Sequence, residues 1–80
     1  MDLVLYMFDT CPYCQRVIDE IKSQKRTDID FKNIQQNEEN RNRLIEIGGK
    51  SQVPCLVIEG KPLYESADII EWLRSNPQIT

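Results

Sequence analysis

Two cysteines, separated by two residues, lie in the segment TCPYC, residues 10–14, directly after an apolar run. A pair with this spacing can form a structural disulfide, contribute to a metal site or carry out thiol chemistry. A structural disulfide is disfavoured because closing so short a loop removes little entropy from the unfolded chain. A zinc site needs four nitrogen or sulfur ligands, whereas the chain has no histidine and only one further cysteine, Cys55. We therefore interpret the pair as a redox centre, expect no metal, and expect Cys55 to be an inert buried thiol.

The residues around the pair predict which cysteine reacts. Pro12 is favoured at the first position of a helix, which makes Cys11 the N-cap residue. An N-cap side chain accepts hydrogen bonds from backbone N–H groups one turn ahead, here those of Tyr13 and Cys14, and the helix dipole stabilises a negative charge there. Because the thiolate is the attacking species, Cys11 is predicted to be the nucleophile. Cys14 lies one turn further along and is predicted to resolve a mixed disulfide formed on Cys11.

Hydrophobic periodicity predicts the elements that must position this pair. We expect strands at residues 3–8, 28–34, 55–58 and 63–64, and helices at residues 12–25, 38–48 and 66–75. Asn37 is expected to cap the second helix, which Gly48 or Gly49 would end. The order β-α-β-α-β-β-α predicts an α/β layered fold with a small mixed sheet flanked by helices. The 80 residues are expected to form one domain, residues 1–80.

Composition excludes several classes of function. The formal net charge is −3 and the sequence pI is about 4.8, so no basic field is available to bind nucleic acid. The apolar run at residues 3–8 is too short to span a bilayer and has no basic segment before it. Three cysteines, an odd number, fit a reducing compartment better than a secreted disulfide scaffold. We expect a cytoplasmic, monomeric protein with neither nucleic-acid nor membrane partners.

Three motifs together resemble the glutaredoxins, which have the thioredoxin-like fold. They are CPYC after a short buried strand, VP opening a later strand, and YESADIIEWL as the closing helix, and together they span essentially the whole chain. The resemblance implies a glutathione-dependent thiol-disulfide oxidoreductase that reduces protein disulfides and glutathione mixed disulfides. Cys11 would attack and become glutathionylated, and Cys14 would close the intramolecular disulfide in the dithiol route. Glutathione and disulfide-containing or glutathionylated proteins are the implied partners.

The resemblance also implies residues that bind glutathione. Tyr13 would flank the tripeptide, and the backbone of Val53 would pair with its cysteine part in the manner of a strand edge. Pro54 would be the cis proline of the family. Gln52 stands where a threonine is usual, and its amide could still bond to glutathione.

A second group of residues concerns the two carboxylates of glutathione. Glu65 and Ser66 begin the last helix, where free N–H groups and the helix dipole suit the γ-glutamyl carboxylate. This Glu-Ser segment is similar to that of glutathione transferase N-terminal domains. Phe8 replaces the lysine that commonly precedes the motif, so Arg16 or Lys50 would have to supply the missing positive charge.

Two alternatives remain open at this point. A reductase of the same fold could take electrons from a thioredoxin reductase and ignore glutathione. A non-catalytic module could instead hold glutathione or a metal cluster. The intact CPYC motif argues against the second, because a binding module needs no resolving thiol.

Overall fold

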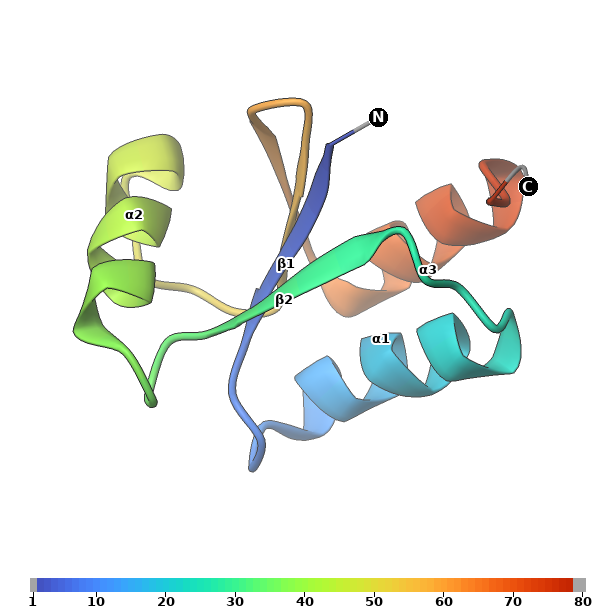
Figure 1. Cartoon of the computed structure of the whole chain (residues 1–80), viewed down its shortest axis with the longest axis horizontal. Coiled ribbons are helices and arrows are strands. Elements are labelled where there is room, and N and C mark those ends of the chain that lie inside the picture. The colour runs from blue at the N-terminus through green and yellow to red at the C-terminus, as the bar shows by residue number, and fades with distance from the viewer. Residues whose placement is uncertain (1, 79–80) are drawn as a thin grey trace.

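The computed structural model describes residues 2–78 and contains the predicted order of elements (Figure 1). They are β1 (Leu3–Met7), α1 (Pro12–Ser23), β2 (Ile29–Asn33), α2 (Glu38–Gly48), β3 (Cys55–Ile58), β4 (Lys61–Tyr64) and α3 (Ser66–Ser75). The four strands form one sheet in the order β2-β1-β3-β4. The β1·β2 pair is parallel, whereas β1·β3 and β3·β4 are antiparallel. The mixed sheet confirms the predicted fold.

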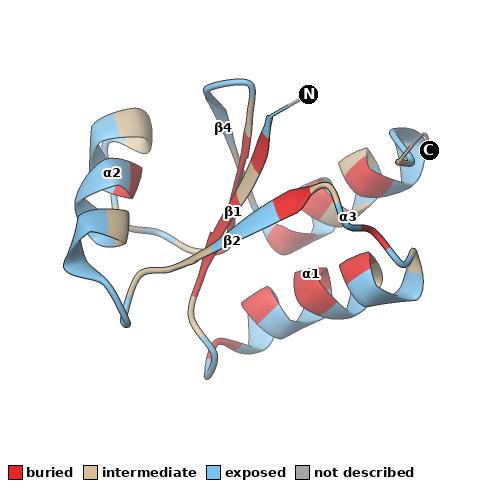
Figure 2. Cartoon of the chain, viewed as in Figure 1, coloured by how far each residue is buried: buried red, intermediate tan, exposed pale blue. Residues whose placement is uncertain are grey.

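Helices cover both faces of the sheet, with α1 and α3 on one face and α2 on the other (Figure 1). Because successive side chains of a strand point to opposite faces, Leu3 and Leu5 of β1 pack against α1 and α3, whereas Tyr6 packs towards α2. The buried residues therefore line the surfaces that the sheet and helices turn towards one another (Figure 2). The face with α1 and α3 holds the larger core, which includes Cys11 and Cys14.

The helix α2 is attached less firmly than the other two. Leu44 is its only buried residue within the described chain, whereas α1 buries Cys14, Val17, Ile18 and Ile21. The hydrophobic pattern of this helix also predicts that Ile45 packs, but Ile45 is exposed because it lies about 100° around the helix from Leu44. α2 thus packs against the rest of the molecule mainly through Leu44, with Ile47 partly buried beside the same cluster.

The β3–β4 hairpin corrects one predicted boundary. β4 begins at Lys61, not at Leu63, and the turn contains only Glu59 and Gly60. Both turn residues have positive φ, 50° and 86°, as the tightest hairpin turns require. Pro62 consequently lies inside β4, where its missing N–H is tolerated because β4 is an edge strand.

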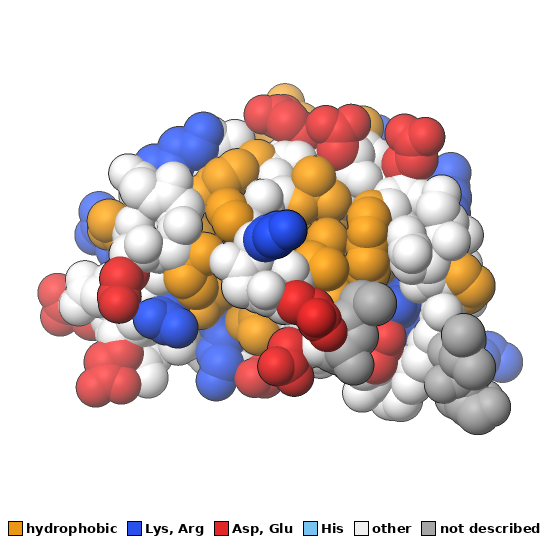
Figure 3. All heavy atoms as spheres, turned by 90° about the horizontal axis from the view of Figure 1, so that it is seen from above, with side chains coloured by type: hydrophobic (Ala, Val, Ile, Leu, Met, Phe, Trp, Pro, Cys, Tyr) orange, Lys and Arg blue, Asp and Glu red, His pale blue; other side chains and the backbone are white. Residues whose placement is uncertain are grey.

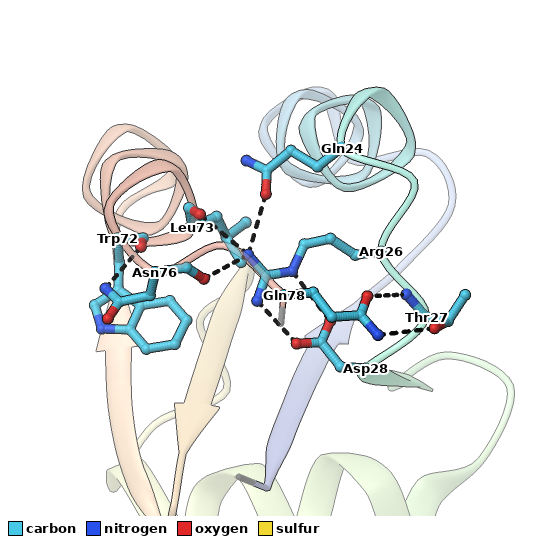
Figure 4. Close-up of polar contacts among 8 residues, drawn as sticks. All are labelled: Gln24, Arg26, Thr27, Asp28, Trp72, Leu73, Asn76 and Gln78. Carbon is cyan, nitrogen blue, oxygen red and sulfur yellow. Dashed lines mark hydrogen bonds and ion pairs between the residues drawn. The ribbon is translucent and has the colours of Figure 1, made fainter. Parts of the chain in front are cut away.

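A buried arginine joins the end of α3 to the connection between α1 and β2 (Figure 4). The Arg26 side chain is 2% exposed and forms a two-point ion pair with Asp28, at 3.0 Å from Nε and 2.9 Å from Nη2. Its Nη1 donates to the carbonyl oxygens of Leu73 at 3.0 Å and Asn76 at 2.8 Å. These carbonyls lie at the C-terminal end of α3, where helical partners are lacking. The Arg26 guanidinium therefore caps the C-terminal end of α3 by donating hydrogen bonds to these carbonyls.

Seen from above, the molecule presents hydrophobic side chains around one central basic side chain, with acidic and basic side chains towards the margins (Figure 3). This view looks onto the β3–β4 turn and the start of β1. Within residues 2–78, no helix is long and apolar enough to cross a membrane.

Candidate active site

Cys11 is the N-cap residue of α1, as predicted. β1 ends at Met7, a short loop follows, and Pro12 is the first helical residue. Cys11 has the extended backbone of an N-cap, with φ −85° and ψ 116°, and its Sγ accepts the N–H of Cys14 at 3.3 Å. The second expected bond, from the N–H of Tyr13, is not formed. One helical N–H thus points directly at the sulfur of Cys11.

The two cysteines differ in their surroundings, although both are free thiols. Cys14 is fully buried, and Cys11 retains 6% of its exposure. Burial, and then the hydrogen bond to Cys11, raise the pKa of Cys14 to about 12, against a weaker opposing effect of the Phe8 backbone. Cys14 is therefore a neutral thiol at physiological pH, while Cys11 sits at the positive end of the helix dipole.

Tyr13 and Val53, two of the predicted binding residues, have different environments. Tyr13 projects from the first turn of α1 and is 60% exposed. Val53 is partly buried and packs against the core cluster that includes Cys11 and Cys14. The Val53–Pro54 peptide bond is cis, as the resemblance implied. β3 begins immediately afterwards, and its pairing with β1 holds this segment beside the end of β1.

The start of α3 places Glu65 and Ser66 in different surroundings. Glu65, not Ser66, is the N-cap residue, and Ser66 is buried as the first helical residue. Glu65 has φ 71°, and its side chain does not cap the helix. Its Oε1 instead accepts the amide of Gln52 at 3.3 Å. The N–H groups of the first turn are therefore left without a side-chain cap, and Gln52 and Glu65 are brought together.

Arg41, which was not among the predicted site residues, can supply the positive charge that was expected from Arg16 or Lys50. Lys50 lies with its Nζ 4.4 Å from the centre of the Tyr64 ring, and thus against β4. Arg41 lines an open cavity of about 490 Å³, together with Phe8, Ile34, Gln35, Glu38 and Ser51. The Phe8 carbonyl accepts the N–H of Cys11 at 3.3 Å, so this cavity adjoins the backbone of Cys11.

Arg41 belongs to the charged run Glu38–Arg43, a pattern that is also typical of a solvated helix face. Its position depends on how the start of α2 packs near the end of β1, which composition does not reveal. Among residues 2–78, no three His, Cys, Asp or Glu side chains are grouped so that they could hold a metal ion.

A comparison with known families decides the assignment. The family model described as Glutaredoxin matches residues 3–63, well over half of the chain. The protein belongs to the glutaredoxin family. No curated protein sequence matches this glutaredoxin significantly. Family membership, the fold and the CPYC pair support a thiol oxidoreductase.

Solved structures support the same fold. The holo form of glutaredoxin C1 from Populus tremula x tremuloides is 19% identical with a TM-score of 0.70, and the match covers 94% of this glutaredoxin and 76% of that chain. Glutathione transferase Omega 3C from Trametes versicolor is 29% identical with a TM-score of 0.79, covering 94% and 33% of the two chains. An epsilon-class glutathione S-transferase from the housefly, Musca domestica, is 21% identical with a TM-score of 0.75, covering 91% and 34%. This glutaredoxin thus spans about a third of the length of those transferases.

Proposed function

We propose that this glutaredoxin is a glutathione-dependent thiol-disulfide oxidoreductase in which Cys11 attacks and Cys14 resolves. The observation that carries the proposal is the asymmetry of the two sulfurs. Cys11 Sγ accepts a helical N–H at 3.3 Å, whereas the pKa of Cys14 is raised to about 12, chiefly by burial. An attacking thiol must be available as the thiolate, and a resolving thiol must wait until the first step is complete.

The reaction proceeds by two thiol exchanges. The thiolate of Cys11 attacks the glutathione sulfur of a mixed disulfide, and the substrate sulfur leaves as a thiolate that takes up a proton. A second glutathione thiolate then attacks the glutathione sulfur bound to Cys11, which releases glutathione disulfide and restores the Cys11 thiolate. With a protein disulfide as substrate, the Cys11 thiolate first attacks one of its two sulfurs and releases the other as a thiolate that takes up a proton. Cys14 then attacks the sulfur of Cys11, its proton passes to the departing substrate thiolate, and a Cys11–Cys14 disulfide remains.

Glutathione has two carboxylates, and the proposal assigns each of them a binding group. The uncapped first turn of α3, next to Glu65 and Ser66, suits the γ-glutamyl carboxylate. Arg41, in the cavity beside Phe8, suits the glycine carboxylate. The backbone of Val53 would pair with the peptide between them, and exposed Tyr13 would cover it. In this arrangement Gln52 and Pro54 complete the binding site, with Gln52 bonded to Glu65.

Substitution of each cysteine tests the proposed roles. With a small glutathione mixed disulfide as substrate, Cys11→Ser should abolish turnover, whereas Cys14→Ser should retain it. Cys14→Ser should also accumulate a glutathione adduct on Cys11, detected by intact mass, because the intramolecular disulfide cannot form. Equal loss of activity in the two variants would contradict the assignment.

The electron source is tested separately. Turnover is measured with glutathione and glutathione reductase, and then with a thioredoxin reductase as the only source of electrons. The proposal expects activity with glutathione. Activity with thioredoxin reductase alone would favour the alternative, which the replacement of a lysine by Phe8 keeps open.

A further inference from the structure

The strand β2 leaves one edge of the sheet unpaired. The strand order β2-β1-β3-β4 places β2 and β4 at the two edges. β4 contains Pro62, which lacks an N–H and so disfavours pairing with a further strand, whereas β2 contains no proline. In Figure 1, β2 lies in front of β1, and no other segment crosses in front of it. The β2 edge is therefore accessible to a further strand.

The backbone groups of Phe31 point outwards along this edge. Ile34 donates its N–H to the carbonyl of Met7 at 2.9 Å, so Ile34 faces β1. In a parallel pair, the backbone N–H and C=O groups of alternate residues point towards the partner strand. The backbone groups of Asp30 and Lys32 therefore also point towards β1, and those of Phe31 point away from it. Within residues 2–78, β2 pairs with β1 alone, so this orientation leaves the N–H and the carbonyl of Phe31 without a partner strand. Both groups are free to pair with another strand.

The side chains around Phe31 form a self-complementary pattern. Asp30 and Lys32 flank it on the sheet face towards α2, where they are 63% and 42% exposed and their charged atoms are 3.5 Å apart. The Phe31 side chain lies on the opposite face and is 45% exposed, a large apolar area at an unpaired edge. Reversing the order Asp-Phe-Lys places each charge opposite its counter-charge.

We propose that β2 pairs antiparallel with β2 of a second copy of this chain, about a two-fold axis at Phe31. The N–H of each Phe31 donates to the carbonyl of the other, and the two phenyl rings meet on one face of the joined sheet. On the other face, Asp30 of each copy lies opposite Lys32 of the other, which gives two cross-strand ion pairs. A two-fold interface of this kind uses the same surface on both chains.

The charges of Asp30 and Lys32 favour a second copy of this chain as the partner of the β2 edge. An unrelated strand would need opposite charges at the same spacing, whereas this strand supplies them to itself in one orientation only. A parallel alignment brings like charges level with each other. The contact is short, because the Asn33 carbonyl next to it already accepts the Asn40 amide at 3.0 Å. We therefore infer a weak dimer that forms at high concentration, with the expected monomer as the dilute form.

The dimer is independent of the thiol chemistry. Cys11 follows the carboxyl end of β1, and the antiparallel arrangement directs the two active sites towards opposite ends of the joined sheet. Neither Asp30 nor Lys32 belongs to the proposed glutathione site. Failure of one proposal would thus leave the other unaffected.

Charge exchange at the edge tests the inference. Asp30→Lys and Lys32→Asp each place like charges opposite one another in the proposed dimer, whereas the double variant restores opposite charges with their positions exchanged. Sedimentation equilibrium from about 1 µM to about 1 mM should show self-association of the wild type and of the double variant. Each single variant should associate at least about tenfold more weakly, since two attractive pairs become repulsive.

Retained turnover with a glutathione mixed disulfide, or an unchanged circular dichroism spectrum, verifies that each variant is folded. A wild type that stays monomeric over the whole concentration range would overturn the inference. So would single variants that associate as tightly as the wild type, or a double variant that associates no better than the single variants.

Discussion

Cys14 and Cys55 show how similar burial can accompany different roles. Both side chains are fully buried, and burial raises the pKa of each thiol. Cys14, however, shares a hydrogen bond with Cys11, whereas Cys55 lies in the separate cluster beneath α2. Burial thus disfavours ionisation of both thiols, and Cys14 differs from Cys55 in lying against Cys11, the proposed nucleophile.

Alkylation should reveal this order of reactivity. At about pH 7, iodoacetamide should modify Cys11 first, because Cys14 is raised to a pKa of about 12 and Cys55 is buried. Peptide mass spectrometry after short exposure should find the label at Cys11 alone, and all three cysteines should react in denaturant. Modification of Cys14 or Cys55 at the rate of Cys11 in the folded protein would contradict this expectation.

Arg41 is a second residue whose role can be isolated. Arg41→Gln should raise the KM for glutathione by about fivefold with little change in kcat, because a partly exposed ion pair contributes up to about 1 kcal/mol. Arg43→Gln is the matched control: it lies on the same helix, and its ion-pair partner, at 3.2 Å, is Glu46. Equal effects of the two substitutions would show that only the net charge matters.

At the scale of elements, the helices are secured by different means. α1 and α3 share the larger core, and Arg26 additionally links the C-terminal end of α3 to the start of β2. α2 has Leu44 and the close approach of Gly48 to the Tyr64 hydroxyl. A Cβ at Gly48 would clash with that hydroxyl, so this glycine sets how closely α2 approaches β4. The helix that carries Arg41 is thus the one that buries the fewest residues among those described.

The Arg26–Asp28 pair should make stability depend on pH in acid. The hydrogen bond from Arg26 holds the pKa of Asp28 below its ordinary value. The stability it contributes is present above the unfolded pKa, near pH 4, and is lost as the pH falls through the folded value. Asp28→Asn should therefore lower the free energy of unfolding by about 1–3 kcal/mol at about pH 7, and the difference from wild type should shrink towards about pH 3.

Urea unfolding of both proteins at the two pH values measures this difference. Glu20→Gln is the control, because Glu20 pairs with the exposed Arg74 and its loss should cost much less. A constant difference between wild type and Asp28→Asn at both pH values would mean that the charge of Asp28 is not involved.

For the molecule as a whole, the sequence predicted the structural features that depend on residues close together along the chain. The N-cap at Cys11 followed from Pro12, and the order of elements followed from hydrophobic periodicity. The exposure of Phe31 did not, because it results from the place of β2 in the strand order. The bond between Gln52 and Glu65 joins segments that only the folded chain brings together. Within the site, local rules thus predicted the redox pair better than the residues around it.

Pro62 has a consequence for how far the sheet can grow. With a proline on β4 and the β2 edge used by a second copy, the joined sheet ends after eight strands and offers no template to a third chain. Polymerisation into fibrils needs two edge strands on every subunit that can each pair with another chain. We therefore expect association to stop at the dimer, so that concentrated solutions of this protein remain clear.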